Sequence, residues 1–190
     1  RNVLRRRSER GASLVEGAII APVFFFTLFM MIEGSFLLRT NLSVNHAVRE
    51  GARIESVIGN GATADKETLV KIKESLISLD PDNVVDVAVW EADGPGDPVP
   101  TSCRTNSQNN VCNSYDDLEQ LTTKWGCETG AKDAYWCPRD RIVKLSPATG
   151  GPPDYVGVWV QYRHDTLTGL FAKDFTVEAS AIIRIEPQEK

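Results

Sequence analysis

An uncharged apolar run near the N-terminus constrains this chain more than any other feature. The run extends from Gly17 to Ile32 and continues past Glu33 to Leu38 before Arg39 ends it. About 22 apolar residues, each rising about 1.5 Å along a helix, are enough to cross a hydrocarbon core of about 30 Å. Aromatic and methionine side chains occur on all sides of this helix and leave no polar face for water. The sequence therefore predicts a transmembrane helix rather than the buried helix of a soluble protein.

The charge distribution predicts how this helix is oriented. The first ten residues hold five arginines and one glutamate, whereas the whole chain has a net charge of -5. Since positive flanks remain in the cytoplasm, we expect a cytoplasmic N-terminus and an exported chain from about residue 40 onward. An ordinary secretory signal peptide fits less well, because no small-x-small cleavage site cleanly follows the run. The acidic remainder also argues against a broad nucleic-acid surface.

The residues that precede the apolar run resemble a prepilin cleavage site. The sequence R-G-A-S-L-V-E-G places Gly11 after the basic arm and Glu16 five positions beyond it, at the membrane edge. In type IV pilin-like proteins a membrane peptidase cuts after such a glycine, which would make Ala12 the new N-terminus. A carboxylate in a low-dielectric bundle is tolerable when it pairs with the free amine of a neighbouring subunit. The alternative is a glycine before a helix and an acid in its first turn, which the helix dipole favours.

The wider N-terminal segment closely resembles TadE-like proteins, which are pseudopilins of the tight-adherence, or Flp pilus, assembly system. The matching features are the basic arm, G-x-S-x-V-E at 11–16, A-P at 21–22, I-E-G at 32–34 and A-V-R-E-G-A-R at 47–53. Gly17 departs from the aromatic residue expected after the first glutamate, and the pair at 34–35 departs from the expected aromatic-glycine pair. The resemblance does not extend to the cysteine-containing region.

This resemblance implies a minor pseudopilin in the bacterial inner or cytoplasmic membrane, with a single span. The implied partners are membrane lipid, the prepilin peptidase, other pilins or pseudopilins and inner-membrane assembly proteins. Small residues in the helix would allow neighbouring helices to approach closely. The candidates for this helix packing are Gly17, Ala18, Ala21 and Gly34.

The periodicity beyond the membrane predicts a long helix and a small exported domain. Apolar residues recur at helical spacing, so the transmembrane helix is expected to continue as an amphipathic stalk over 12–58. These stalk residues are Leu38, Leu42, Val48, Ala52 and Val57. A second helix is predicted over 64–79, with Thr63 or Asp65 as its cap. Alternating patterns predict strands over 84–92, 155–164 and 175–186.

The four cysteines lie in a polar region between the first and second of these strands. Their spacing matches no C-x-x-C metal or redox pattern, and the predicted orientation places them in an oxidising compartment. Two disulfides are therefore expected among Cys103, Cys112, Cys127 and Cys137. Sequence leaves three pairings open, with a slight preference for the two local loops. Two tryptophans, Trp125 and Trp136, flank the second loop. Packing on that loop is favoured, and the alternative is an adhesive or partner-binding patch.

Together these elements predict an α+β protein. It would have a basic arm at 1–11 that resembles a prepilin leader, a transmembrane and stalk helix at 12–58, and a pilin-like extracytoplasmic domain at 62–190. That domain would contain an antiparallel sheet, one packed helix and a cysteine-rich insertion at about 93–138.

No catalytic motif accompanies this architecture. The sequence has two histidines, His46 and His164, in segments that are predicted to be stalk and strand. It has no nucleophile elbow, H-E-x-x-H, P-loop or dinucleotide-binding pattern, so we predict no enzyme, metal site or cofactor. The alternative to a pseudopilin is an uncleaved single-span protein whose disulfide domain binds a ligand or a surface.

Overall fold

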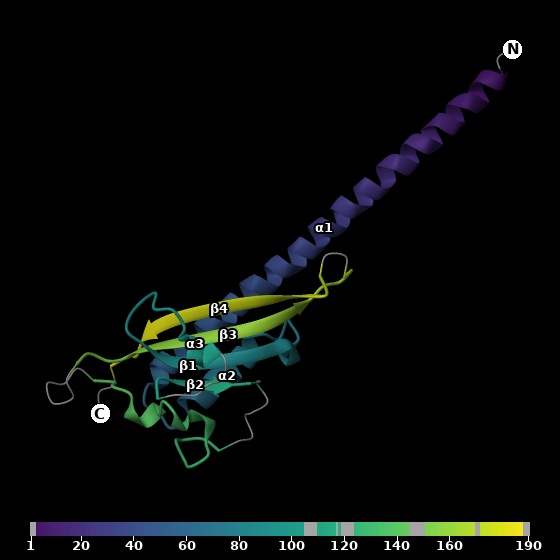
Figure 1. Ribbon diagram of the computed structural model, residues 1–190. Helices are drawn as coiled ribbons and strands as arrows, with labels where there is room; N and C mark the ends of the chain where they lie inside the picture. The colour runs from purple at the N-terminus through teal and green to yellow at the C-terminus, as the bar shows by residue number, and fades with distance from the viewer. Residues whose placement is uncertain are drawn as a thin grey trace.

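One long helix, α1, carries a small α+β domain near its C-terminal end (Figure 1). The computed structural model describes residues 3–104, 110–116, 118, 124–144, 151–169 and 172–187, with the side chains of α1 described from Gly11 onward. α1 spans Val3–Ile58 and contains Pro22 without ending there. It begins within the predicted basic arm, because no proline interrupts that segment and Gly11 costs only about 1 kcal/mol relative to alanine in a helix interior.

α1 divides into a bare part and a part that is packed against the domain. Side chains from 11 to 31 are exposed apart from the half-buried Ala21, whereas a buried stripe runs along the helix from residue 33. The stripe contains Glu33, Thr40, Val44, Ala47, Val48, Gly51, Ala52 and Glu55. The predicted stalk face was therefore only partly correct, since Val48 and Ala52 are buried but Leu38 and Leu42 are 61% and 63% exposed.

Four antiparallel strands follow α1 and α2 in the chain. α2 spans Ala64–Ser75, the short helix η1 spans Pro81–Asn83, and the strands are β1 (Val84–Ala92), β2 (Cys112–Tyr115), β3 (Tyr155–Asp165) and β4 (Asp174–Arg184). The strand order is β2-β1-β3-β4. The α+β class is confirmed. The predicted strands at 84–92, 155–164 and 175–186 correspond to β1, β3 and β4, while α2 ends earlier than the predicted residue 79.

The two central strands of the sheet, β1 and β3, are largely buried on both faces. α1 and α2 pack on one face, where residues of β1, β3 and β4 such as Val87, Val158 and Val177 form the main core with Val44 and Leu69. Their alternation follows from the two-residue period of a strand.

A second cluster lies on the opposite face, beneath the short helix α3 (Thr101–Arg104). There the ring of Trp90 lies over Gly157, where an added Cβ would be 2.3 Å from ring carbons of the tryptophan. Glycine at position 157 is therefore required by the close approach of the Trp90 side chain rather than by its backbone angles.

Both disulfides close local loops of the cysteine-rich region. Cys103 is bonded to Cys112 and Cys127 to Cys137, which is the preferred pairing. The region also contributes β2, which was not predicted because its four residues, Cys-Asn-Ser-Tyr, carry no alternating apolar pattern. Its described residues also form the short helices η3 (Lys132–Ala134) and η4 (Pro138–Asp140).

Candidate functional site: the exposed helix and its junction with the domain

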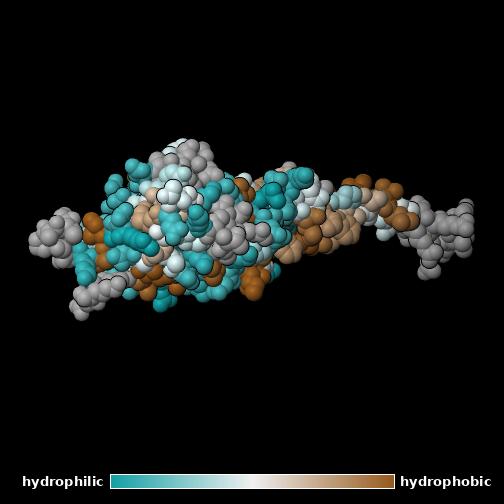
Figure 2. Space-filling model, turned by 90° about the horizontal axis from the view of Figure 1, so that it is seen from below, coloured by the Kyte–Doolittle hydropathy of each residue, from teal (hydrophilic) through white to brown (hydrophobic). Residues whose placement is uncertain are grey.

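The exposed part of α1 has the surface of a membrane-spanning helix. A candidate span lies within Gly11–Ile58, and its most apolar window has no buried residue. Figure 2 shows hydrophobic side chains along this projecting part of the helix, whereas the domain surface is mainly hydrophilic. The hydroxyl of Thr27 donates to the carbonyls of Val23 and Phe24 at 3.1 and 2.8 Å, so it needs no water partner. This arrangement suits a hydrocarbon environment, where polar groups must be satisfied internally.

The predicted processing residues lie at the far end of this exposed segment. Gly11, Ala12 and Glu16 are all exposed and belong to the continuous helix α1. No hydrogen bond or ion pair engages the Glu16 carboxylate within the part of the chain that the structure describes. The structure therefore provides no intramolecular partner for this carboxylate among the described residues.

The predicted packing residues fall into two groups. Gly17, Ala18 and Ala21 lie close together on the exposed helix, and an added Cβ at Gly17 would meet open space. At about 100° per residue, the 17 steps from Gly17 to Gly34 fall about 100° short of five full turns. Gly34 therefore lies on a different side of the helix from Gly17. It lines a shallow pocket beside Phe175 of β4. A neighbouring helix could thus approach the first group without meeting the domain.

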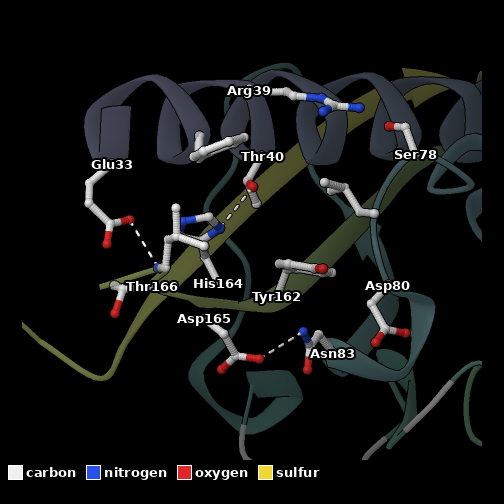
Figure 3. Close-up of a pocket in the computed structure, with 13 residues that line it drawn as sticks. Glu33, Arg39, Thr40, Ser78, Asp80, Asn83, Tyr162, His164, Asp165 and Thr166 are labelled. Atoms are coloured by element: carbon white, nitrogen blue, oxygen red, sulfur yellow. Dashed lines mark hydrogen bonds between the residues drawn. The ribbon is translucent and has the colours of Figure 1, made fainter. Parts of the chain in front are cut away.

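Glu33 of α1, unlike Glu16, is fully engaged by the domain. The Glu33 carboxylate accepts hydrogen bonds from the backbone amides of Leu167 and Thr168 at 3.1 and 2.7 Å, and from the Thr168 hydroxyl at 2.8 Å. These donors lie in the turn between β3 and β4, beside the helix face shown in Figure 3. Charge-assisted bonds to a carboxylate are stronger than neutral ones, so this contact fixes the turn to α1.

A cavity of about 360 Å³ adjoins this contact, between α1, the C-terminal end of α2 and the end of β3. The His164 side chain lines it and hydrogen-bonds through Nδ1 to the Thr40 hydroxyl at 2.9 Å. Asn83 donates to Asp165 at 3.2 Å on the opposite wall (Figure 3). His164 therefore has a structural partner from α1 that the sequence did not reveal, because Thr40 lies 124 positions earlier in the chain.

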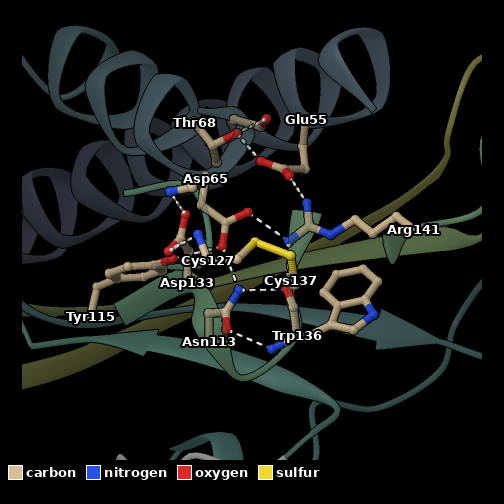
Figure 4. A network of polar contacts seen from close by, with 12 residues as sticks. Glu55, Asp65, Thr68, Asn113, Tyr115, Cys127, Asp133, Trp136, Cys137 and Arg141 are labelled. Carbon is tan, nitrogen blue, oxygen red and sulfur yellow. Dashed lines mark hydrogen bonds and ion pairs between the residues drawn. A yellow bond between two sulfur atoms is a disulfide. The ribbon is translucent and has the colours of Figure 1, made fainter. Parts of the chain in front are cut away.

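A buried ionic network joins α1, α2 and the cysteine-rich region (Figure 4). The guanidinium of Arg141 contacts Glu55 of α1 and donates to Asp65 of α2 at 2.6 Å. Asp65 also accepts from the side chains of Tyr115 and Asn113 at 2.6 and 2.7 Å. The Arg141, Glu55 and Asp65 side chains are fully buried. Asp65 was predicted as a possible helix cap and instead serves as a buried ion partner, while Thr63 occupies the cap position without a side-chain hydrogen bond.

Burial controls the ionisation of this network. Burial, and then the nearby charge of Asp65, raise the pKa of Glu55 to about 8. The Glu55 carboxyl is thus mostly neutral at pH 7, and its proton can be shared with the hydroxyl of Thr68, which contacts the other carboxyl oxygen. Arg141 and Asp65 then form the charged pair.

The cation also lies 4.0 Å from the centre of the Trp136 ring, with Trp125 stacked on Tyr115. Both tryptophans beside the second disulfide therefore pack into the domain, as predicted. The network fastens the cysteine-rich region to both helices.

The comparison with known families concerns the N-terminal helix. Residues 11–53 match the family model for TadE-like proteins. This segment of the chain is TadE-like. No curated protein and no solved structure matches it.

The TadE-like segment contains the exposed residues 11–31 of α1 and most of its packed face. Its first glutamate, Glu16, is exposed, and its second, Glu33, is bound by the β3–β4 turn. The match ends within α1, so the sheet and both disulfides lie outside it. Among the described residues of this TadE-like chain, no group of three or more metal-ligating side chains is brought together.

Proposed function

We propose that this TadE-like chain is a minor pseudopilin, a non-enzymatic component of tight-adherence pilus assembly. In this proposal α1 anchors it in the inner or cytoplasmic membrane, with residues beyond the span outside the cytoplasm. The prepilin peptidase removes the arm after Gly11, which makes Ala12 the N-terminus, and Glu16 then pairs with the N-terminal amine of a neighbouring pilin or pseudopilin.

The contrast between Glu16 and Glu33 of α1 carries this proposal. A carboxylate in a span costs on the order of 3 kcal/mol near its centre and less near its ends, where these two residues lie. Glu33 offsets its cost through three hydrogen bonds within its own chain. Glu16 has no such partner among the described residues, so a second molecule is the natural source of one. Gly17 and Ala21 lie nearby and leave room for that molecule's helix.

Processing at Gly11 requires a local opening of α1. The Gly11–Ala12 peptide lies inside the helix, which begins at Val3. A peptidase must reach an extended backbone, and glycine reduces the cost of unwinding by about 1 kcal/mol relative to alanine. The glycine thus favours cleavage at this place in an otherwise regular helix.

The first test is N-terminal sequencing and intact mass of the protein from its own host, with and without the prepilin peptidase. The proposal expects Ala12 as the N-terminus only when the peptidase is present. A basic arm retained in both hosts would contradict it. That outcome would favour an uncleaved membrane protein whose disulfide domain binds a ligand or surface.

A second test separates Glu16 from the general effect of a carboxylate in the helix. Glu16→Gln should leave cleavage intact and reduce co-purification with other pilins or pseudopilins several-fold, since the amide cannot neutralise an amine. The matched control is Glu33→Gln, the same substitution in the same helix at a carboxylate with partners in its own domain. An equal loss of association in both variants, or in neither, would refute the pairing role of Glu16.

A further inference from the structure

The turn between β3 and β4 lies at the outer end of the proposed membrane span. Glu33 directly follows the uncharged run that ends at Ile32, and its carboxylate holds the amides of Leu167 and Thr168. The bound amides keep the turn at the level of Glu33 along α1. In Figure 1 this end of the β3–β4 hairpin lies beside α1 and is directed toward its N-terminal part. The position of the domain along the helix axis is therefore fixed by hydrogen bonds.

Apolar surface continues from the span onto this hairpin. Leu167 is 71% exposed at the turn and Phe175 is 38% exposed at the start of β4. Phe175 lines a pocket of about 150 Å³ together with Met30 and Leu37 of α1. Met31, which follows Met30 on α1, has a side chain that is 71% exposed. Burying such surface contributes about 25 cal/mol per Å², so an apolar environment would be favoured here.

We propose that the β3–β4 turn docks into the outer interfacial layer of the phospholipid bilayer through Leu167 and Phe175. The domain then lies directly on the membrane surface, and no exposed length of helix separates it from the bilayer. This inference rests on the proposed anchoring of α1 in a membrane, and it adds a second point of lipid contact. Lipid is the expected occupant because the apolar patch is continuous with the surface of the span.

The geometry also limits how deep the turn can go. The interfacial layers account for the difference between a hydrocarbon core of about 30 Å and a whole bilayer of about 40–45 Å, or roughly 5–7 Å on each side. Leu167 and Glu33 are joined by a direct hydrogen bond, so the turn reaches that layer when Ile32 ends the hydrocarbon core. Asp165 and Asp174 pair with each other where the two strands enter the turn, and their carboxylates belong in water. Lys173, which is exposed on the same turn, can reach lipid phosphates.

The test measures the depth of individual positions in the full-length protein, reconstituted in vesicles of phosphatidylethanolamine and phosphatidylglycerol. A small fluorescent amino acid replaces Leu167, Phe175, Phe25 or Tyr135, one at a time, so that the disulfides are untouched. Quenching is compared for lipids that carry a nitroxide near the headgroup or deep in the acyl chain. Tyr135 is the control, because it is 43% exposed in the cysteine-rich region.

The proposal expects shallow quenching at positions 167 and 175 that is several-fold stronger than at position 135. It also expects Glu33→Ala to abolish the difference at position 167, because the turn is then released. Quenching at 167 and 175 no greater than at 135 would overturn the docking.

Position 25 separates this failure from a failure of the anchoring itself. Deep quenching there, without quenching at 167 and 175, would leave the anchor intact and reject only the docking. If position 25 is not quenched either, both the proposed span and the docking are wrong.

Discussion

Replacing Arg141 by methionine should destabilise the domain more than replacing Glu55 by glutamine. The substitution keeps most of the side-chain volume but removes the cation between Glu55 and Asp65, which are fully buried. Asp65 would keep the donors from Tyr115 and Asn113 but lose its counter-ion. Removing one partner of a buried ion pair costs about 3–5 kcal/mol, because the remaining charge is desolvated without compensation.

Glu55→Gln should by contrast be neutral or stabilising at pH 7, because glutamine is neutral without taking up a proton on folding. Burial and the charge of Asp65 raise the pKa of Glu55 to about 8, so the native side chain is already mostly neutral at this pH. Glutamine preserves its shape, its acceptor toward Arg141 and a donor toward Thr68. Arg141→Met and Glu55→Gln each change one partner of the same contact, but only Arg141→Met should lower the free energy of unfolding strongly.

The pH dependence provides a second test with a defined sign. The unfolded Glu55 carboxyl has a pKa of 4.5, and the folded one about 8. Between these values the folded protein binds more protons, so the free energy of unfolding falls as pH rises from about 5 to about 8. Each pKa unit corresponds to about 1.36 kcal/mol, which makes the expected loss a few kcal/mol. Glu55→Gln should flatten this slope.

The assay is urea unfolding of the oxidised full chain in mild detergent, followed by near-ultraviolet circular dichroism. The Trp136 ring lies against the Arg141 cation and should report the change. The reasoning would be refuted if Glu55→Gln destabilised the domain as much as Arg141→Met, or if its unfolding free energy kept the wild-type pH slope.

The same assay tests three further features. Gly157→Ala should cost about 1–3 kcal/mol because the new Cβ would collide with the Trp90 ring, and an unchanged midpoint would contradict that packing. Replacing Cys103 and Cys112 together by alanine should lower the free energy of unfolding by about 3 kcal/mol, because the unfolded loop gains freedom. A double variant as stable as the oxidised wild type would contradict this. Burial, and then the charge of Asp116, raise the pKa of Asp86 to about 7. The folded protein therefore holds a proton on Asp86 that the unfolded chain releases, and the free energy of unfolding falls as pH rises toward 8. Asp86→Asn should therefore stabilise the domain by about 1 kcal/mol at pH 8 and have little effect at pH 5, whereas equal effects at both pH values would argue against this origin.

Local patterns were sufficient to predict most of the secondary structure. The strand predicted over 84–92 has the bounds of β1, and the strands that became β3 and β4 differ by one or two residues at their ends. A strand with a two-residue apolar period can bury a face in only one register, so its position is largely set by its own sequence. The apolar helix is likewise determined by composition and length.

The errors occur where a residue's neighbours in space are far away in sequence. β2 has no apolar alternation and forms because β1 offers an unpaired edge, with Trp90 opposite Cys112. Asp65 lies in the first turn of α2, and its side chain points into the core toward Arg141, 76 positions later. Leu42 follows the apolar spacing of the stalk and still faces outward, because the sheet covers the side of α1 that carries Val44.

The sequence by itself determined an apolar helix of membrane-spanning length, the family of its first segment and the strands that follow. Only the tertiary structure decided which glutamate of that helix is satisfied within the chain. Glu33 and Glu16 lie in similar apolar surroundings in the sequence, but Glu33 meets the amides of a turn 134 positions away and Glu16 meets no partner among the described residues. The physical reason is that a helix pattern depends on near neighbours, whereas a buried hydrogen bond depends on which distant backbone the fold brings within about 3 Å.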